Sequence, residues 1–118
     1  MKKLMCILAA AAVVGTLGAT AFATGATVDA KSASVVPAGI EVLAATSGAP
    51  DGSVVFGYMI DPETGNAYPV GHSPVDPPTG TAVLMFPDIT QKLRLDLRGP
   101  GGALLASSSI SLVDLFEQ

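Results

Sequence analysis

Alternation of apolar and charged residues is strictest near the C-terminus of this 118-residue chain. Over 92–98, three leucines occupy every second position, and Lys, Arg or Asp fills the positions between them. Successive side chains of a strand point to opposite faces, so this pattern predicts a strand with one buried and one solvated face. Gly-Pro-Gly-Gly at 99–102 predicts a tight turn, and a second alternating stretch follows over 104–112. Residues 92–112 are therefore predicted to form a β-hairpin.

Shorter apolar stretches upstream predict further strands. Residues 40–44 show the alternation of a strand, and the Ser-Gly-Ala-Pro-Asp-Gly cluster at 47–52 predicts that the chain reverses after them. The continuous apolar run over 53–60 has the length of a strand, and its lack of alternation predicts that both of its faces are covered. Another apolar run over 81–86 ends at Pro87.

The remaining segments complete an all-β pattern. Residues 67–75 contain Pro69 and Pro74, and the loss of two backbone donors confines such a stretch to a sheet edge or an ordered loop. The last residues, 113–118, are predicted to form a short helical turn or the frayed end of the preceding strand. Because no stretch after residue 24 has the helical period, five to seven short strands remain. This pattern predicts a small antiparallel β-sandwich of the immunoglobulin-like kind, with a small open barrel as the alternative.

One internal repeat lies in the middle of the chain. The pattern apolar-Asp-Pro-x-Thr-Gly-x-Ala occurs at 60–67 and again at 75–82. Asp accepts bonds from backbone N–H groups just after it, Pro fixes the first corner, and Gly adopts the positive φ that closes such a loop. Both copies are therefore predicted to be turns between strands, and turn chemistry alone explains the repeat.

The N-terminus has the three parts of a secretory signal peptide. Two lysines precede an apolar run over 4–14, and the small-x-small sequence Ala21-Phe22-Ala23 follows. We expect cleavage between Ala23 and Thr24; an uncleaved membrane anchor is the alternative. The predicted organisation is a signal peptide over 1–23, a flexible polar arm over 24–34 and a single β-rich domain over 35–118.

Removal of the signal peptide makes the chain strongly acidic. Four cationic residues and ten acidic residues remain, so the net charge becomes 4 − 10 = −6. Such a domain lacks the basic surface that binds nucleic acid or anionic lipid. The single cysteine, Cys6, leaves with the signal, so the mature chain forms no disulfide. We expect an exported protein in the periplasm, on the cell surface or outside the cell, with no stable membrane anchor after cleavage.

The candidate chemistry is sparse. The single histidine, His72, lies next to Ser73 with Asp76 four residues on, but neighbouring residues in one loop do not converge as a nucleophilic triad requires. Asp61, Glu63, Asp76 and Asp88 are oxygen ligands of the kind that calcium prefers, without the dense spacing of a dedicated loop. We therefore expect no enzymatic activity, no cofactor and no resident metal, and we leave calcium binding open.

Two hypotheses of function follow. The first is a non-enzymatic structural, surface or appendage subunit that acts through protein–protein contact with itself or with another exported protein. In this hypothesis the polar arm pairs with the sheet edge of a neighbour. The alternative is a monomeric secreted binding module or inhibitor that presents its turn loops to a soluble partner. The residues predicted for such contacts are Asp61, Glu63, Tyr68, His72 and Asp76.

Overall fold

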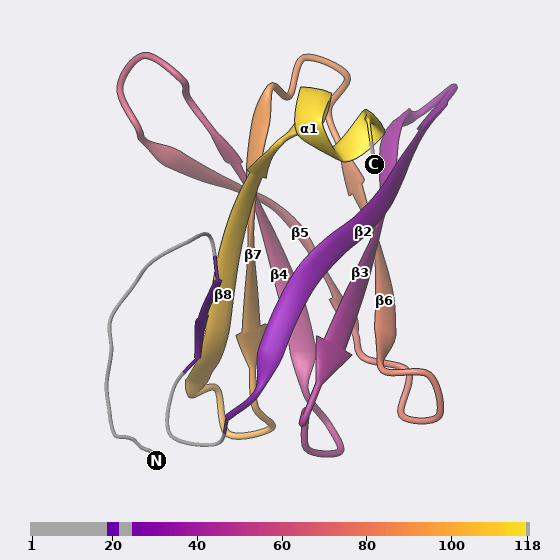
Figure 1. The fold of residues 1–118 in the computed structure, drawn as a ribbon, viewed down its shortest axis with the longest axis vertical. Helices are drawn as coiled ribbons and strands as arrows, with labels where there is room; N and C mark the ends of the chain where they lie inside the picture. The colour runs from indigo at the N-terminus through magenta and orange to yellow at the C-terminus, as the bar shows by residue number, and fades with distance from the viewer. Residues whose placement is uncertain (1–18, 22–24, 118) are drawn as a thin grey trace.

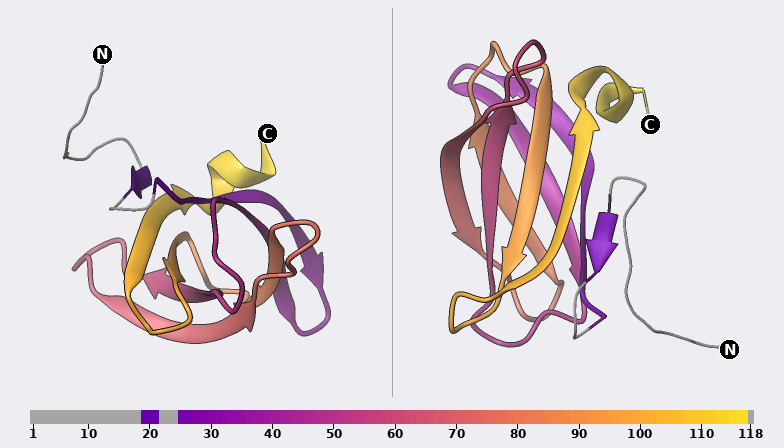
Figure 2. Two further views of the ribbon diagram at one scale, coloured as in Figure 1. Left: turned by 90° about the horizontal axis from the view of Figure 1, so that it is seen from below. Right: turned by 90° about the vertical axis from the view of Figure 1, so that its left-hand side faces the viewer.

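The computed structural model describes residues 19–21 and 25–117, which form two antiparallel sheets packed face to face (Figure 1). In chain order the strands are β1 (Ala19–Ala21), β2 (Thr27–Val36), β3 (Gly39–Ser47), β4 (Val54–Ile60), β5 (Ala67–Pro74), β6 (Thr81–Phe86), β7 (Lys92–Arg98) and β8 (Leu104–Ser111), and the helix α1 (Leu112–Phe116) follows them. One sheet has the order β2-β3-β6 and the other β8-β7-β4-β5, with β1 added to the edge at β8. Figure 2 shows the two layers from the side.

The order of the strands is that of an immunoglobulin-like Greek key. Counted from β2, the first, second and fifth strands of the sandwich form one sheet, and the third, fourth, sixth and seventh form the other. In a constant-type immunoglobulin domain the fourth strand pairs with the fifth, whereas here the fourth strand, β5, pairs with β4. The predicted antiparallel sandwich is confirmed, and the open-barrel alternative is wrong.

The core consists of the alternate side chains that point inward from both sheets. Strand β7 contributes Leu93, Leu95 and Leu97, which are fully buried. The opposite layer contributes Ile40, Val42 and Ala44 from β3 and Ala82, Leu84 and Phe86 from β6. The period-two pattern of the sequence thus specifies which face of each strand is buried, because side chains of the two inner faces interdigitate.

Several local predictions are confirmed. Strands β7 and β8 form the hairpin predicted over 92–112. Strand β5 lies at the edge of its sheet, as its two prolines require. The end of the chain forms the predicted short helical turn, α1, and the hydroxyl of Ser111 accepts a bond from the backbone N–H of Asp114 (3.3 Å) at its first turn. No helix in the described residues is long and apolar enough to cross a membrane.

The prediction of a flexible arm over 24–34 is wrong for residues 27–34, which lie in strand β2. This strand pairs with β3 along nearly its whole length and has a bulge between Ala30 and Ser32. Val28 and Ala30 are buried against the core, although the residues around them are small or polar. Pairing with β3 supplies the backbone hydrogen bonds, and two inward side chains are enough to anchor the strand.

Two predictions about exposure also need correction. Strand β4 was expected to be covered on both faces, yet only Val55 and Gly57 on its inner face are buried. Its outer aromatic residues are half-buried because side chains of the neighbouring strands cover them. On β7 the charged face was expected to be solvated, but Asp96 is only 3% exposed. Its carboxylate is covered by the side chain of Arg94, as described below.

Candidate contact surfaces

The two Asp-Pro-x-Thr-Gly segments form matching turns, as predicted. In each, the glycine at the fifth position donates its N–H to the carbonyl of the aspartate: Gly65 to Asp61 (2.8 Å) and Gly80 to Asp76 (2.7 Å). Both glycines have positive φ, 78° and 70°. The carboxylate of Asp61 accepts the N–H of Glu63, and that of Asp76 accepts the hydroxyl of Thr79. These carboxylates bond within their own turns, which agrees with a structural origin of the repeat.

The predicted contact residues do not form one surface. Asp61 and Glu63 lie in the turn that precedes β5, and Asp76 lies in the turn that follows it, so the two turns occupy opposite ends of the sandwich (Figure 1). Tyr68 and His72 lie between them on the exposed edge strand. A binding module that uses both turns together would therefore have to contact its partner at both ends of the sandwich.

The histidine has an aromatic partner. The ring of His72 stacks on Phe56 of the adjacent strand, with ring centroids 5.3 Å apart. Neither Ser73 nor Asp76 is hydrogen-bonded to it. Within the described ranges, no group of three or more His, Cys, Asp or Glu side chains is placed to hold a metal ion.

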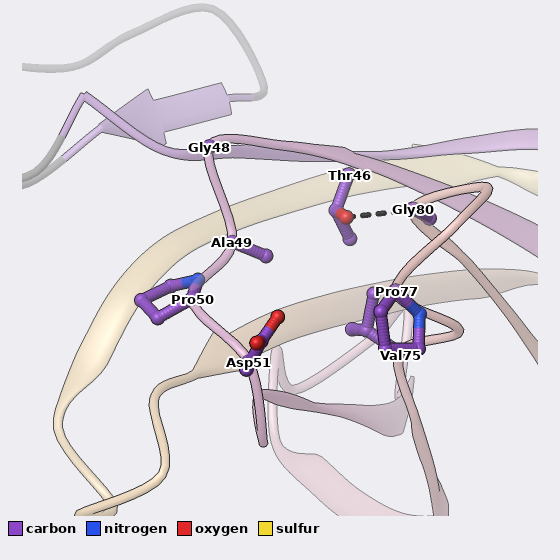
Figure 3. Close-up of a pocket in the computed structure, with 8 residues that line it drawn as sticks. All are labelled: Thr46, Gly48, Ala49, Pro50, Asp51, Val75, Pro77 and Gly80. Carbon is purple, nitrogen blue, oxygen red and sulfur yellow. Dashed lines mark hydrogen bonds between the residues drawn. The ribbon is translucent and has the colours of Figure 1, made fainter.

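A small pocket lies between the loops at the end opposite α1. Figure 3 shows that its lining comes from residues 46–51 and from residues 75–80. The hydroxyl of Thr46 donates to the carbonyl of Gly80 (2.7 Å), which ties the two loops together. The volume of this pocket is about 140 Å³, which is below the range of volumes of sites that hold small-molecule ligands.

The outer face of the four-stranded sheet carries a network of paired polar side chains. The guanidinium of Arg94 lies 4.3 Å from the ring centre of Tyr58, and its NH2 group donates to the carboxylate of Asp96 (3.2 Å). The hydroxyl of Ser107 donates to the same carboxylate (2.7 Å). On the same strand, Arg98 donates to the carbonyl of Gly102. Two of the three basic side chains of β7, Arg94 and Arg98, are therefore engaged within the protein.

Apolar side chains gather at the end of the sandwich that carries α1, and we call this surface the apolar end. Its exposed members are Val35 (74%), Ile89 (71%), Val113 (65%) and Phe116 (47%). They come from β2, the β6–β7 loop and α1, which lie together in Figure 1. A groove of about 590 Å³ runs among them, lined in part by Val35, Leu112, Val113 and Phe116. A smaller groove of about 220 Å³, lined in part by Tyr68 and Ile89, adjoins it at Pro62 and Gln91.

A second apolar surface lies on the outer face of the three-stranded sheet, and we call it the β6 face. Val83 (49% exposed) and Met85 (41%) project from β6, and Leu43 (36%) projects beside them from β3. Leu43 is the direct cross-strand partner of Val83, and Glu41 is that of Met85. Isolated exposed apolar residues are common, but adjacent ones on paired strands form a continuous patch.

Two of the three residues at the predicted cleavage site, Ala23 and Thr24, lie outside the described residues. Ala21 is the last residue of β1, which pairs with β8 over Ala106–Ser108. Cleavage after Ala23 would remove this strand. Signal cleavage and export remain predictions.

Comparison with known proteins gives no relative. No protein-family model matches the chain, and searches of curated proteins and of solved structures found no match.

Sequence reasoning missed both apolar surfaces. Val83 and Met85 of the β6 face belong to an apolar run that is typical of a buried strand, since they are as apolar as their buried neighbours. The alternation that separates the two faces of β6 is invisible when both faces are apolar. The apolar end is assembled from three separate segments, and no local pattern brings them together.

Proposed function

We propose that this protein is a non-enzymatic exported subunit that works through protein–protein contact, with a second copy of itself as the partner. The observation that supports this most directly is the apolar end. Three of its side chains are at least 65% exposed, and two of them, Val35 and Val113, line a groove of about 590 Å³. Large contiguous apolar patches on a small soluble domain typically mark interaction sites, because burying them on association removes apolar area from water.

The shape of the apolar end favours pairing with the same end of a second copy. Phe116 and Val113 project from α1 directly beside the groove that they help to line. Two copies related by a two-fold axis can then insert the projecting side chains of each into the groove of the other. Such self-complementary contacts are the commonest kind in protein assemblies.

The groove has polar as well as apolar lining residues. Thr90 lines it, and the Oγ1 of this residue is buried without a hydrogen-bond partner in the described protein. Asp88 and Lys92 also line the groove, which is the polar component expected of a protein contact.

The test is to place a charge at the centre of the apolar end. The protein is expressed from its full sequence, recovered after export and studied by analytical ultracentrifugation as wild type and as Phe116→Glu. We expect the variant to weaken self-association at least tenfold, because a buried, unpaired carboxylate in the contact is strongly unfavourable. Ser34→Glu, an exposed position on β2, is the matched control and should associate like the wild type.

Either of two results would contradict this proposal. One is equal association of Phe116→Glu and wild type. The other is a wild-type protein that stays monomeric alone but forms a complex with a different exported protein through the same end, which would replace the second copy as the partner.

A further inference from the structure

The edges of the two sheets differ in how well they are protected against pairing with another strand. An edge strand presents a row of unpaired N–H and C=O groups, and proteins block it with charges, prolines, bulges or a covering segment. Four strands need such protection here: β5 and β8 in one sheet and β2 and β6 in the other.

Three of these edges carry a recognisable block. Strand β5 contains Pro69 and Pro74, which cannot donate to a ladder. Strand β2 carries exposed Asp29 and Lys31 and has a bulge at this point. Strand β8 is covered by β1 over the three residues that pair with it. If cleavage removes β1, the outward side chains that β8 offers at its edge are serines rather than apolar groups.

Strand β6 carries none of these blocks beyond Thr81, the one residue at which Asp76 pairs with its open edge. Its six residues, Thr-Ala-Val-Leu-Met-Phe, include no charge, proline or glycine, and no bulge interrupts its pairing with β3. Its outer face is the exposed apolar β6 face. The β-branched and aromatic residues among them, Thr81, Val83 and Phe86, are of the kinds enriched in strands.

The hydrogen bonds of β6 identify the groups that face its open edge. The carbonyl of Thr81 accepts the N–H of Asp76, which lies on the side away from β3. Backbone groups alternate in direction along a strand, so the N–H and C=O of Val83 and Met85 also point away from β3. Beyond the bond at Thr81, these outward groups have no backbone partner in the described protein.

We propose that β6 pairs antiparallel with β6 of a second copy, so that the two three-stranded sheets join into one continuous six-stranded sheet. This inference extends the proposed function by adding a second contact between copies, and it rests on a different surface. Pairing satisfies the outward backbone groups of Val83 and Met85 and brings the apolar side chains of the two β6 faces together.

Geometry restricts the register. Directly opposed residues of an antiparallel pair have their side chains on the same face, so their numbers are both odd or both even. One residue therefore opposes its own copy, and the two-fold axis lies midway between the two. The longest overlap of Thr81–Phe86 with itself places the axis at Val83 or Leu84. In the first register Val83 opposes its own copy, and in the second Val83 opposes Met85. The register at Leu84 pairs Val83 with Met85, whose outward groups have no other backbone partner. The register at Val83 also sets Met85 against Thr81, whose outward carbonyl already accepts the N–H of Asp76.

Two substitutions at Val83 test the contact in exported protein made from the full sequence. Val83→Lys places on β6 a lysine, the residue that natural proteins often use to block an edge strand. Val83→Pro removes one outward N–H and leaves the bonds to β3 in place. Both should weaken association at least tenfold in sedimentation experiments. Ser34→Lys on β2 is the control and should not, while unchanged circular dichroism and melting of Val83→Lys would show that the fold is intact.

Cysteine cross-linking gives an independent readout, since the predicted mature chain has no cysteine. Hydrogen-bonded antiparallel pairs have Cα atoms about 5.5 Å apart, a separation that a disulfide can bridge. Val83→Cys should form a covalent dimer if the axis passes through Val83, and Val83→Cys/Met85→Cys should do so in either register. Ser34→Cys should stay monomeric on a non-reducing gel.

The outcomes separate this inference from the proposed function. Loss of association in Val83→Lys but not in Phe116→Glu supports the β6 contact and overturns pairing through the apolar end. The reverse result overturns the β6 contact alone. If both contacts exist, wild type forms assemblies larger than a dimer and each variant stops at a dimer, because each two-fold contact by itself joins only two copies.

Discussion

The outer faces of the two sheets, which enclose one shared core, are built in opposite ways. On the four-stranded sheet, Arg94 and Ser107 both donate to Asp96, and Tyr58 lies under the guanidinium. On the three-stranded sheet, Leu43 and Val83 lie side by side in water. The first face pairs its charged groups within the chain, and the second leaves apolar groups and an open edge without partners.

This difference indicates where the molecule is suited to contact. A face whose charges are already paired gains little from a partner, since association would have to replace bonds that exist. A face of exposed apolar groups beside unpaired backbone groups gains both apolar burial and hydrogen bonds. The proposed contact surfaces of this chain are therefore the β6 face and the apolar end.

The largest expected effect comes from a glycine that sets the distance between the sheets. A Cβ at Gly57 would lie 2.8 Å from Phe86 and 3.0 Å from Leu84, both inward residues of β6. Gly57→Val should lower the free energy of unfolding by about 3 kcal/mol and displace β6, so association through that strand falls as well. Thermal and urea unfolding measure the loss.

Gly71 provides the matched control for this change. It is the direct cross-strand partner of Gly57, yet nothing lies within 4 Å of a Cβ placed there. Gly71→Val should change stability by less than about 0.5 kcal/mol. Equal destabilisation by the two substitutions would mean that the contact between Gly57 and β6 does not set the sheet spacing.

A smaller effect is expected from Asp96, the buried carboxylate of the paired face. Asp96→Ala removes the partner of both Arg94 and Ser107. Breaking a fully buried pair costs roughly 3–5 kcal/mol, and because the side chain of Arg94 is 34% exposed we expect about 2 kcal/mol. Glu41→Ala on the other face should cost less than about 0.5 kcal/mol, since Glu41 is exposed. Similar losses in urea unfolding would remove the contrast between the faces.

Much of this architecture follows from local patterns in the sequence. The leucines of β7 alternate strictly, so both the strand and its buried face are predictable. The glycines and prolines at 99–102 place the hairpin turn, and Pro69 and Pro74 place β5 at an edge. Each of these signals is local, since it depends on one residue's backbone freedom or on its neighbours two positions away.

The features that could not be predicted from the sequence depend on contacts between residues that are far apart in the chain. Strand β2 has too few apolar residues to be predicted, and it forms because β3 offers a matching edge. Asp96 is buried because Arg94 and Ser107 surround it, and Ser107 comes from the other strand of the hairpin. The apolar end joins Val35, Ile89 and Phe116, which are far apart in the chain. Such features arise only when the topology is known.

The smallest expected effect concerns ionic strength. If the signal peptide is cleaved as predicted, each chain has a net charge of 4 − 10 = −6, and the repulsion between two chains opposes contact through surfaces that are themselves mostly apolar. Because salt screens this repulsion over about 10 Å at 0.1 M, association should strengthen roughly threefold to tenfold between low and moderate salt. Sedimentation equilibrium measures the change. Weaker association at higher salt would instead indicate a contact held by ion pairs.

The most direct test of the central claim, self-association of an exported contact subunit, is light scattering behind size-exclusion chromatography. The sample is wild-type protein recovered after export, studied over a wide range of concentration. We predict a molar mass that rises with concentration above that of a single chain. A single-chain mass at every concentration would contradict it and would favour a monomeric binding module.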